Sequence, residues 1–288
     1  MTKPCQGPEA ALRPQLVAPA GACDCHAHVL GPLDAYPYQD DRAYTAPPAL
    51  YEDYRAMLDT IGIDRAVIVQ PSAYGTDNRC TLQAIARDPA RMRGVAVFGD
   101  DITDAELQAM HDGGIRGVRF NLLFVGGVGL DSLEVIAARI ARFGWHIQLL
   151  IDYRTLPDLA DRLAGLPVDI VVDHMGHMPV EEGVGNPGFQ ALLRLMSEGK
   201  SWVKVSGNYR VSKAAPAYAD AIPFAQALLA ANPDRCVWGS DWPHVGIWPG
   251  EPMPNDADLL DALLDYAPDE ALRRRILVDN PARLYGFD

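Results

Sequence analysis

The sequence predicts an α/β protein whose single domain is a (β/α)8 TIM barrel. Short apolar runs, most of them rich in Val and Ile, alternate eight times with longer amphipathic runs. The apolar runs are continuous, which is typical of parallel strands buried on both faces. The length of 288 residues suits one such barrel, because these domains need roughly 250 residues.

The expected elements follow one another along the whole chain. We expect strands over residues 22–29, 65–70, 92–97, 117–121, 145–151, 168–172, 202–205 and 236–238. Helical spacing of apolar side chains predicts helices over 50–60, 103–113, 131–143, 156–166, 187–197, 219–231, 259–266 and 269–278. Thr103 and Glu106 form a capping box, and Asp77 or Asn78 is suited to cap a helix after the second strand.

An open, doubly wound sheet is the alternative arrangement of these elements. That fold usually carries a glycine-rich phosphate turn after its first strand, whereas this strand ends in His26-Ala27-His28-Val29. No repeat and no low-complexity linker divides the sequence, so we expect residues 21–288 to form the barrel. We expect residues 1–20 to be an N-terminal extension that wraps the barrel bottom or frays.

The composition limits the partners of the protein. A formal net charge of -13 argues against nucleic acid and against a membrane, since both are anionic. A small anionic substrate is still compatible, because a few arginines in a pocket reverse the local potential. Five cysteines without a Cys-x-x-Cys pair indicate reduced thiols and a cytoplasmic location. We expect no signal peptide and no membrane span, and the sequence does not predict the oligomeric state.

Polar residues gather where the predicted strands end, which is where TIM barrels carry their chemistry. His26 and His28 end the first strand and, being two residues apart, point to the same side. His174 follows the sixth strand and Asp241 follows the eighth. We expect these four side chains to meet and to form the catalytic set.

Further polar residues on the loops after these strands are candidates for substrate contacts. They are Tyr44, Ser72, Tyr74, Arg119, His177, Arg210 and His244. Arg119 ends the fourth strand of an acidic protein and therefore needs an anionic partner. That partner is either a substrate carboxylate or a protein acid such as Asp241.

Several stretches together resemble the amidohydrolase superfamily, and in particular its 2-pyrone-4,6-dicarboxylate lactonase branch. The stretches are Val69-Gln70-Pro71-Ser72, Gly117-Val118-Arg119-Phe120-Asn121, Asp173-His174-Met175-Gly176, Trp238-Gly239-Ser240-Asp241-Trp242-Pro243-His244 and Asn280-Pro281-Ala282-Arg283-Leu284-Tyr285. The resemblance implies metal-free hydrolysis of a lactone. It places His26, His28, His174 and Asp241 in the catalytic set. It places Tyr44, Ser72, Arg119 and Arg210 against the substrate.

The sequence departs from that branch at three positions. His177 and Val125 stand where the branch has arginines, and Leu150 stands where it has a tyrosine. Fewer arginines mean fewer clamps for carboxylates. We therefore expect a monocarboxylated or sugar-acid lactone in place of the pyrone dicarboxylate.

The histidine pair also raises the question of a metal cofactor. One Zn or Mn ion held by His26, His28 and Asp241 is the alternative to metal-free chemistry. The fifth strand offers no histidine at its end, and Arg119 on the fourth cannot ligate because it stays protonated. We therefore expect no cofactor.

These expectations combine into a hydrolase that opens a small anionic lactone. Asp241 would activate water, and His26, His28 and His174 would polarise the lactone carbonyl. A metal-dependent decarboxylase, a sugar-acid lactone isomerase and a non-catalytic sugar-acid binding protein are the alternatives that the sequence leaves open.

Overall fold

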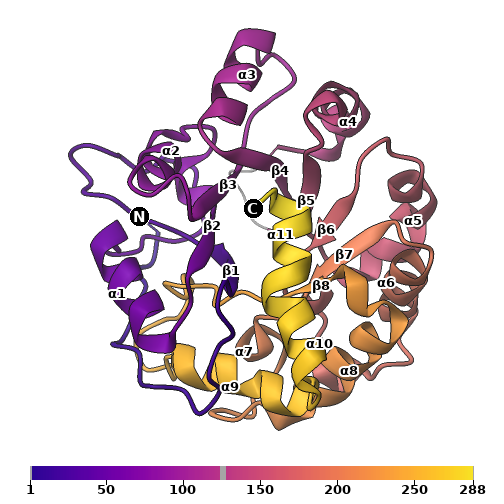
Figure 1. Ribbon diagram of the computed structural model, residues 1–288. Coiled ribbons are helices and arrows are strands. Elements are labelled where there is room, and N and C mark those ends of the chain that lie inside the picture. The colour runs from indigo at the N-terminus through magenta and orange to yellow at the C-terminus, as the bar shows by residue number, and fades with distance from the viewer. Residues whose placement is uncertain (1, 124–127, 288) are drawn as a thin grey trace.

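Eight parallel strands form a nearly closed barrel surrounded by helices in the computed structural model, which describes residues 2–123 and 128–287 (Figure 1). The strands are β1 (Cys23–Ala27), β2 (Arg65–Val69), β3 (Met92–Ala96), β4 (Ile115–Asn121), β5 (His146–Leu150), β6 (Ile170–Val172), β7 (Ser201–Lys204) and β8 (Cys236–Val237). Each strand pairs in parallel with the next one in sequence. The prediction of a single-domain (β/α)8 barrel is confirmed.

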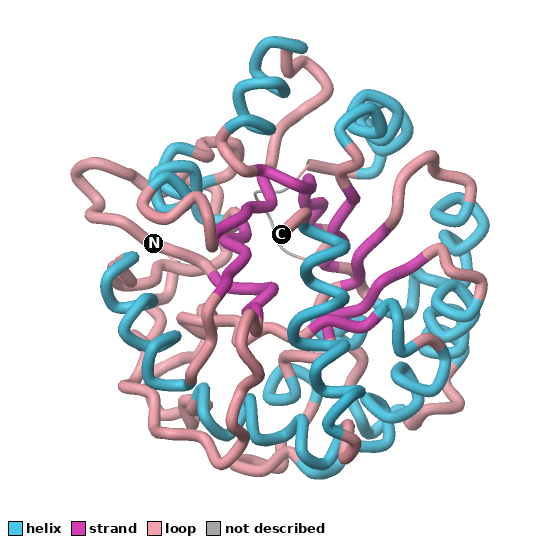
Figure 2. Tube along the Cα trace, viewed as in Figure 1, coloured by secondary structure: helices cyan, strands magenta, loops and turns pink. Residues whose placement is uncertain are grey.

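The helices surround the ring of strands, except that the last one crosses an end of the ring (Figure 2). They are α1 (Tyr51–Ile61), α2 (Arg79–Ala86), α3 (Asp104–Asp112), α4 (Leu133–Ile140), α5 (Leu156–Ala164), α6 (Pro187–Ser197), α7 (Asn208–Val211), α8 (Ile222–Ala231), α9 (Asp256–Tyr266), α10 (Glu270–Arg274) and α11 (Asn280–Tyr285). The helix expected over 269–278 is α10 followed by a π-helical turn, Arg275–Asp279. No helix in the described part of the chain is long and apolar enough to cross a bilayer.

The barrel closes between β1 and the segment that includes and follows β8. The backbone N–H of Cys25 donates to the carbonyl of Trp238 at 2.9 Å, and that of His28 donates to Trp242 at 2.7 Å. The N–H of Asp241 donates to the carbonyl of His26 at 2.8 Å. These backbone hydrogen bonds hold β1 and the residues after it against the segment that follows β8, where the predicted catalytic residues lie.

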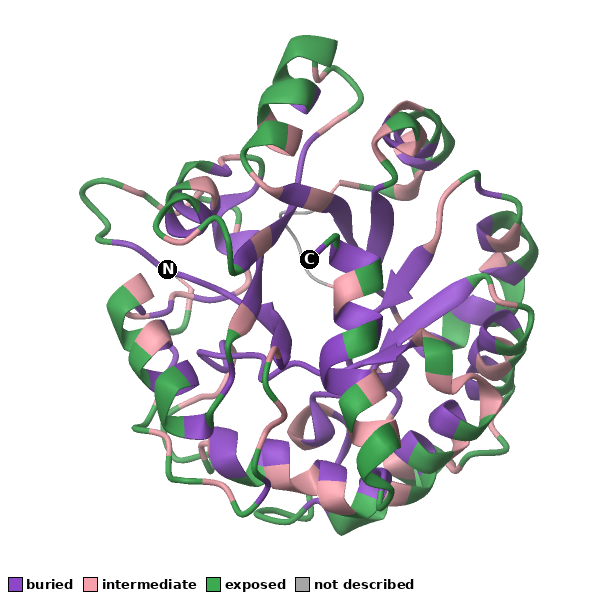
Figure 3. Cartoon of the chain, viewed as in Figure 1, coloured by how far each residue is buried: buried purple, intermediate pink, exposed green. Residues whose placement is uncertain are grey.

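Two apolar cores hold the barrel. The larger one lies between the strands and the helices, and accounts for the buried inner faces of the helices in Figure 3. The smaller one fills the barrel interior, where Leu284, Tyr285 and Phe287 pack with inward-facing side chains such as Cys23 and Val67. Because α11 and the residues after it cover this end of the barrel, a substrate must enter from the opposite end.

A β-bulge in β1 decides which side chains point inward. Asp24 pairs with Ala66 and Ala27 pairs with Ile68, so β1 has one more residue than β2 over this stretch. Asp24 reaches the hydroxyl of Tyr54 on α1 at 2.9 Å, outside the ring. Cys25 packs in the interior core, and His26 also faces inward toward β7. The bulge re-aims His26 into the barrel mouth.

The N-terminal segment takes a different path from the expected one. The N–H of Cys5 donates to Thr45 at 2.8 Å and that of Gln6 donates to Ile247 at 2.9 Å, in loops at the open end of the barrel. Further along, the N–H of Leu16 donates to Asp261 of α9 at 2.8 Å. The segment is held to the rim and the side of the barrel by these bonds, so it neither frays nor stays at the bottom.

Candidate active site

A cavity of about 350 Å³ lies at the carboxyl ends of the strands. Its titratable lining residues are His28, Tyr44, Arg119, His174, His177, Arg210 and Asp241. Ser72 and Asn121 also line it, and Ala43, Leu150, Val245 and Trp248 provide apolar wall. The cavity thus has the mixture of convergent polar groups and apolar surface that is typical of small-molecule sites.

The two loops that carry the central residues have unusual backbone angles. Six described non-glycine residues have positive φ, and five of them follow β6 or β8: His174, Met175, His177, Asp241 and His244. Asp241 has a φ of 65°. Such conformations are costly for non-glycine residues and cluster at functional sites.

Asp241 is a buried, ionised carboxylate. Its Oδ2 accepts from the hydroxyl of Tyr209 at 2.7 Å and from Nε of Arg210 at 2.5 Å. Burial by itself would raise the pKa of Asp241, but the guanidinium of Arg210 holds this pKa well below its usual value. The carboxylate is therefore available as a proton acceptor at neutral pH.

Three imidazoles surround this carboxylate. Nε2 of His26 and of His28 lie 3.7 and 4.0 Å from Oδ1, and Nε2 of His174 lies 3.6 Å from Oδ2. These distances exceed ordinary hydrogen-bond lengths, so the rings are not bonded directly to Asp241, and a reacting group beside such a pair can contact both members. The structure brings the four predicted catalytic residues together, and His28, His174 and Asp241 line the cavity whereas His26 lies behind them.

Burial keeps these imidazoles neutral. It lowers the pKa of His26 to about 4, with Lys204 adding to the effect. Burial also lowers the pKa of His28 and of His174 well below the usual value. Neutral rings each have one N–H donor and one acceptor nitrogen, so the chemistry of each ring depends on its tautomer.

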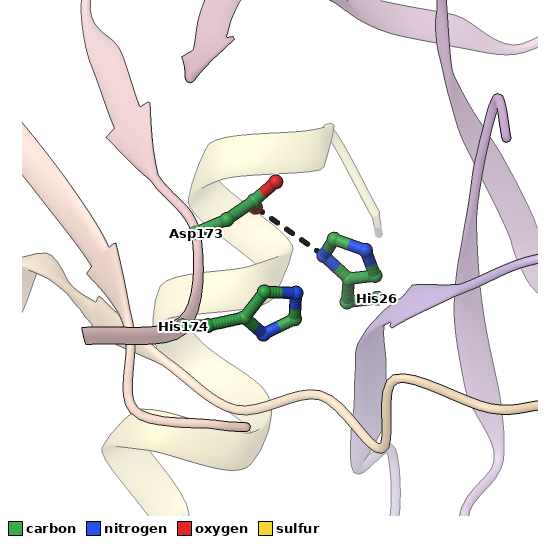
Figure 4. A group of neighbouring side chains, drawn as sticks. All are labelled: His26, Asp173 and His174. Carbon is green, nitrogen blue, oxygen red and sulfur yellow. Dashed lines mark ion pairs between the residues drawn. The ribbon is translucent and has the colours of Figure 1, made fainter. Parts of the chain in front are cut away.

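A second group of charges lies behind His26, and sequence reasoning missed it. The ammonium of Lys204 is 3.1 Å from Nδ1 of His26, 2.8 Å from Oε1 of Gln148 and 3.3 Å from Oδ1 of Asp173. Oδ1 of Asp173 lies 3.2 Å from the same nitrogen of His26, and Figure 4 shows this carboxylate facing the ring. The sequence did contain a signal for this group. Lys204 lies in a strand expected to be buried on both faces, and a buried charge needs polar or charged partners.

The two arginines of the cavity have protein partners. Nη2 of Arg119 lies 3.3 Å from Oδ2 of Asp173. The acidic partner of Arg119 is therefore Asp173 and not Asp241. Arg210 is the residue that pairs with Asp241. Both guanidinium groups still line the cavity, so they can also face an anionic ligand.

The remaining predicted contacts divide into two groups. Tyr44, Ser72 and His177 line the cavity. Tyr74 does not line it, and its hydroxyl accepts from the N–H of Gly31 at 3.0 Å.

His244 also lies behind the cavity wall. It contacts the hydroxyl of Tyr209 at 3.2 Å and Oδ1 of Asp256 at 3.2 Å. Among the three departures from the lactonase branch, His177 and Leu150 line the cavity, and Val125 lies outside the described residues. The two side chains that differ from the branch are thus placed to affect ligand choice.

The site also contains atoms that could approach a metal ion. His26, His28 and Asp241 offer ligand atoms within 4.8 Å of one another. A metal-bound histidine normally donates its other ring N–H to a carboxylate or carbonyl. At His26 that other nitrogen lies 3.2 Å from Oδ1 of Asp173 without a hydrogen bond, whereas the ammonium of Lys204 hydrogen-bonds to it at 3.1 Å and opposes a proton there. The set therefore fits a zinc or manganese ion poorly.

The family model described as Amidohydrolase matches residues 23–287. The chain belongs to the amidohydrolase family. The resemblance inferred from the sequence is confirmed, and with it the expectation that the chain is an enzyme.

This amidohydrolase is similar to three characterised relatives over most of its length. It is 39% identical to 4-sulfomuconolactone hydrolase of Hydrogenophaga intermedia, over 98% of this chain and 94% of the relative. It is 41% identical to 2-pyrone-4,6-dicarboxylate hydrolase of Comamonas testosteroni, over 95% and 92% of the two chains. It is 32% identical to D-galactarolactone isomerase of Agrobacterium fabrum, over 94% and 93%.

Proposed function

We propose that this amidohydrolase hydrolyses a small anionic lactone without a metal ion. The observation that carries the proposal is one ionised carboxylate, Asp241, facing three neutral imidazoles at 3.6 to 4.0 Å, beside a cavity that Asp241, His28 and His174 line. Two relatives are named as hydrolases of lactones, which supports the reaction class. The ammonium of Lys204 beside His26 supports metal-free chemistry.

In the proposed reaction, Asp241 removes a proton from water as the water oxygen bonds to the lactone carbonyl carbon. The imidazoles face the reacting carbonyl and the water. When the ring C–O bond breaks, the proton passes from Asp241 to the departing ring oxygen. The product is a ring-opened acid, and Asp241 is again ionised.

The charges of the cavity favour a substrate with a single negative charge. Among the described lining residues Arg119 and Arg210 are cationic and Asp241 is anionic. An arriving carboxylate can contact both guanidinium groups and compensate the excess positive charge. His177 is neutral, because burial lowers its pKa to about 3. It therefore adds no charge for a second carboxylate. We propose a monocarboxylated or sugar-acid lactone as the substrate.

A panel of lactones tests this proposal. The panel contains pyrone dicarboxylate, muconolactones with and without a sulfonate, and aldaric and aldonic acid lactones. Opening is followed by a pH indicator, and products are identified by NMR. We expect ring-opened acid from at least one monoanionic lactone. A shifted but intact ring would indicate an isomerase, and binding without turnover would indicate a binding protein. Release of CO2 would indicate a decarboxylase.

A further inference from the structure

We propose that His26 and His28 present opposite groups to Asp241, an N–H from His26 and a lone pair from His28, and that Lys204 is the positioning residue that imposes the first. The positions of the ring protons do not depend on the identity of the substrate. The catalytic roles that follow from these positions rest on the function proposed above.

The contact of His28 with the backbone fixes its tautomer. Nδ1 of His28 lies 2.7 Å from the carbonyl oxygen of Val69. A carbonyl oxygen only accepts hydrogen bonds, so Nδ1 must carry the proton. Because burial keeps this ring neutral, Nε2 of His28 is left with a lone pair facing Asp241. His28 is thus an acceptor and cannot donate to an oxyanion.

The contacts of Lys204 fix the opposite tautomer for His26. The fully buried ammonium has three protons. It has hydrogen-bond geometry with Oε1 of Gln148 and with Nδ1 of His26, and it forms an ion pair with Asp173 at 3.3 Å. Burial lowers the pKa of Lys204, and the carboxylate of Asp173 counters this by favouring the ammonium. If Nδ1 of His26 accepts from Lys204, the ring proton must sit on Nε2.

Asp173 is the competing partner of His26, and the structure gives it other donors. Its Oδ2 accepts from Nε2 of Gln148 at 3.0 Å and from Arg119 at 3.3 Å. Its Oδ1 lies 3.2 Å from Nδ1 of His26 and 3.3 Å from the ammonium of Lys204, and it has hydrogen-bond geometry with neither. Asp173 also favours the ammonium form of Lys204, which is the group with hydrogen-bond geometry to Nδ1 of His26.

Because one ring donates and the other accepts a hydrogen bond, His26 and His28 would have different roles in catalysis. Nε2 of His28 and Oδ1 of Asp241 are two acceptors 4.0 Å apart. One water molecule can donate a proton to each at roughly 2.8 Å. His28 would then hold the O–H that stays with the water oxygen, while Asp241 removes the other proton. The N–H of His26, at 3.7 Å from Asp241, would donate to the carbonyl oxygen as its negative charge develops.

His174 is free to adopt either tautomer. Its Nδ1 lies 3.1 Å from the hydroxyl of Ser206, and a hydroxyl can donate or accept. The inference is thus specific to His26 and His28, and predicts nothing for His174.

Nitrogen NMR of the substrate-free enzyme, labelled with 15N-histidine, tests the proposal directly. The ring nitrogens are assigned with His26→Gln and His28→Gln variants. We expect the Nε2–H tautomer for His26 and the Nδ1–H tautomer for His28. A proton on Nδ1 of His26, or on Nε2 of His28, would overturn the proposal. No turnover is needed, so this result is separate from success or failure of the lactonase assay.

The variant Lys204→Met tests the role of the lysine. Without the ammonium we expect the proton of His26 to move to Nδ1, toward Asp173, while His28 is unchanged. On a lactone substrate we expect kcat to fall on the order of 10²-fold, with KM changed less than about threefold. The matched control is Lys213→Met, because that lysine is exposed and pairs with Glu181 at 3.2 Å. It should alter neither readout.

An unchanged His26 tautomer in folded Lys204→Met would contradict the role given to Lys204. If that variant does not fold, the tautomers of the wild-type enzyme still decide the proposal.

Discussion

Replacing Asp241 by Asn separates its role as a base from its role as a structural acceptor. The amide has nearly the same shape, and its oxygen can still accept from Tyr209 and Arg210, which lie 2.7 and 2.5 Å from Oδ2. The amide cannot take a proton from water. General bases contribute about 10²–10⁴-fold, so we expect kcat to fall by about 10³-fold, or about 4 kcal/mol of barrier.

Binding and stability should respond differently from turnover. Arg210 loses its anionic partner in Asp241→Asn, so an anionic, non-hydrolysable analogue should bind at least as tightly. Breaking a buried charge pair costs up to about 3–5 kcal/mol. The retained hydrogen bonds should keep the loss of unfolding free energy at or below the lower end of this range.

The assay combines initial rates, calorimetric titration with the analogue and urea unfolding. Asp161→Asn is the matched control, because that side chain is 95% exposed and its partner Arg194 is also exposed. It should leave all three measurements unchanged. A kcat within tenfold of wild type in folded Asp241→Asn would refute the assignment of Asp241 as the base.

Three further predictions follow from the site and its surroundings. His177→Arg restores a cation at the cavity wall and should raise kcat/KM for pyrone dicarboxylate, relative to a monocarboxylated lactone, by about tenfold; no change in this ratio, measured by competition, would contradict the charge argument. Tyr74→Phe leaves the N–H of Gly31 without its acceptor and should lower the free energy of unfolding by about 1–3 kcal/mol. Its kcat/KM should stay within twofold, whereas a tenfold loss would show that Tyr74 contacts the substrate. Burial lowers the pKa of His26 to about 4 and of His146 to about 3. Between pH 6.5 and 4 both rings are therefore neutral in the folded protein and protonated in the unfolded protein. The free energy of unfolding must fall as the pH falls through this window. Each ring lowers the free energy of unfolding by about 1.4 kcal/mol per pH unit. Equal free energies of unfolding at pH 7 and pH 5, measured with urea, would contradict the burial of neutral rings.

The sequence was sufficient to predict the barrel and the convergence at its mouth. Strand ends in a parallel barrel share one edge, so His26, His28, His174 and Asp241 could be placed together from their order alone. The bulge in β1 could not be predicted, because it depends on the register between Asp24 and Ala27 and their partners on β2.

The sequence also did not predict the partners behind the site. Lys204 and Asp173 were visible as residues, but only the spatial pairing of β6 with β7 places them beside His26. Tyr74 was expected at the substrate because it follows a strand end. Its turn directs the hydroxyl to Gly31 instead. Side-chain direction within a loop is a tertiary property that residue order does not determine.

The central claim is that this chain opens a lactone with its own side chains and no metal. The most direct test is the initial rate of ring opening by enzyme that has been treated with a chelator and whose metal content per chain is then measured. We predict an undiminished kcat at a metal content far below one ion per chain. Loss of activity that one equivalent of zinc or manganese restores would contradict the claim.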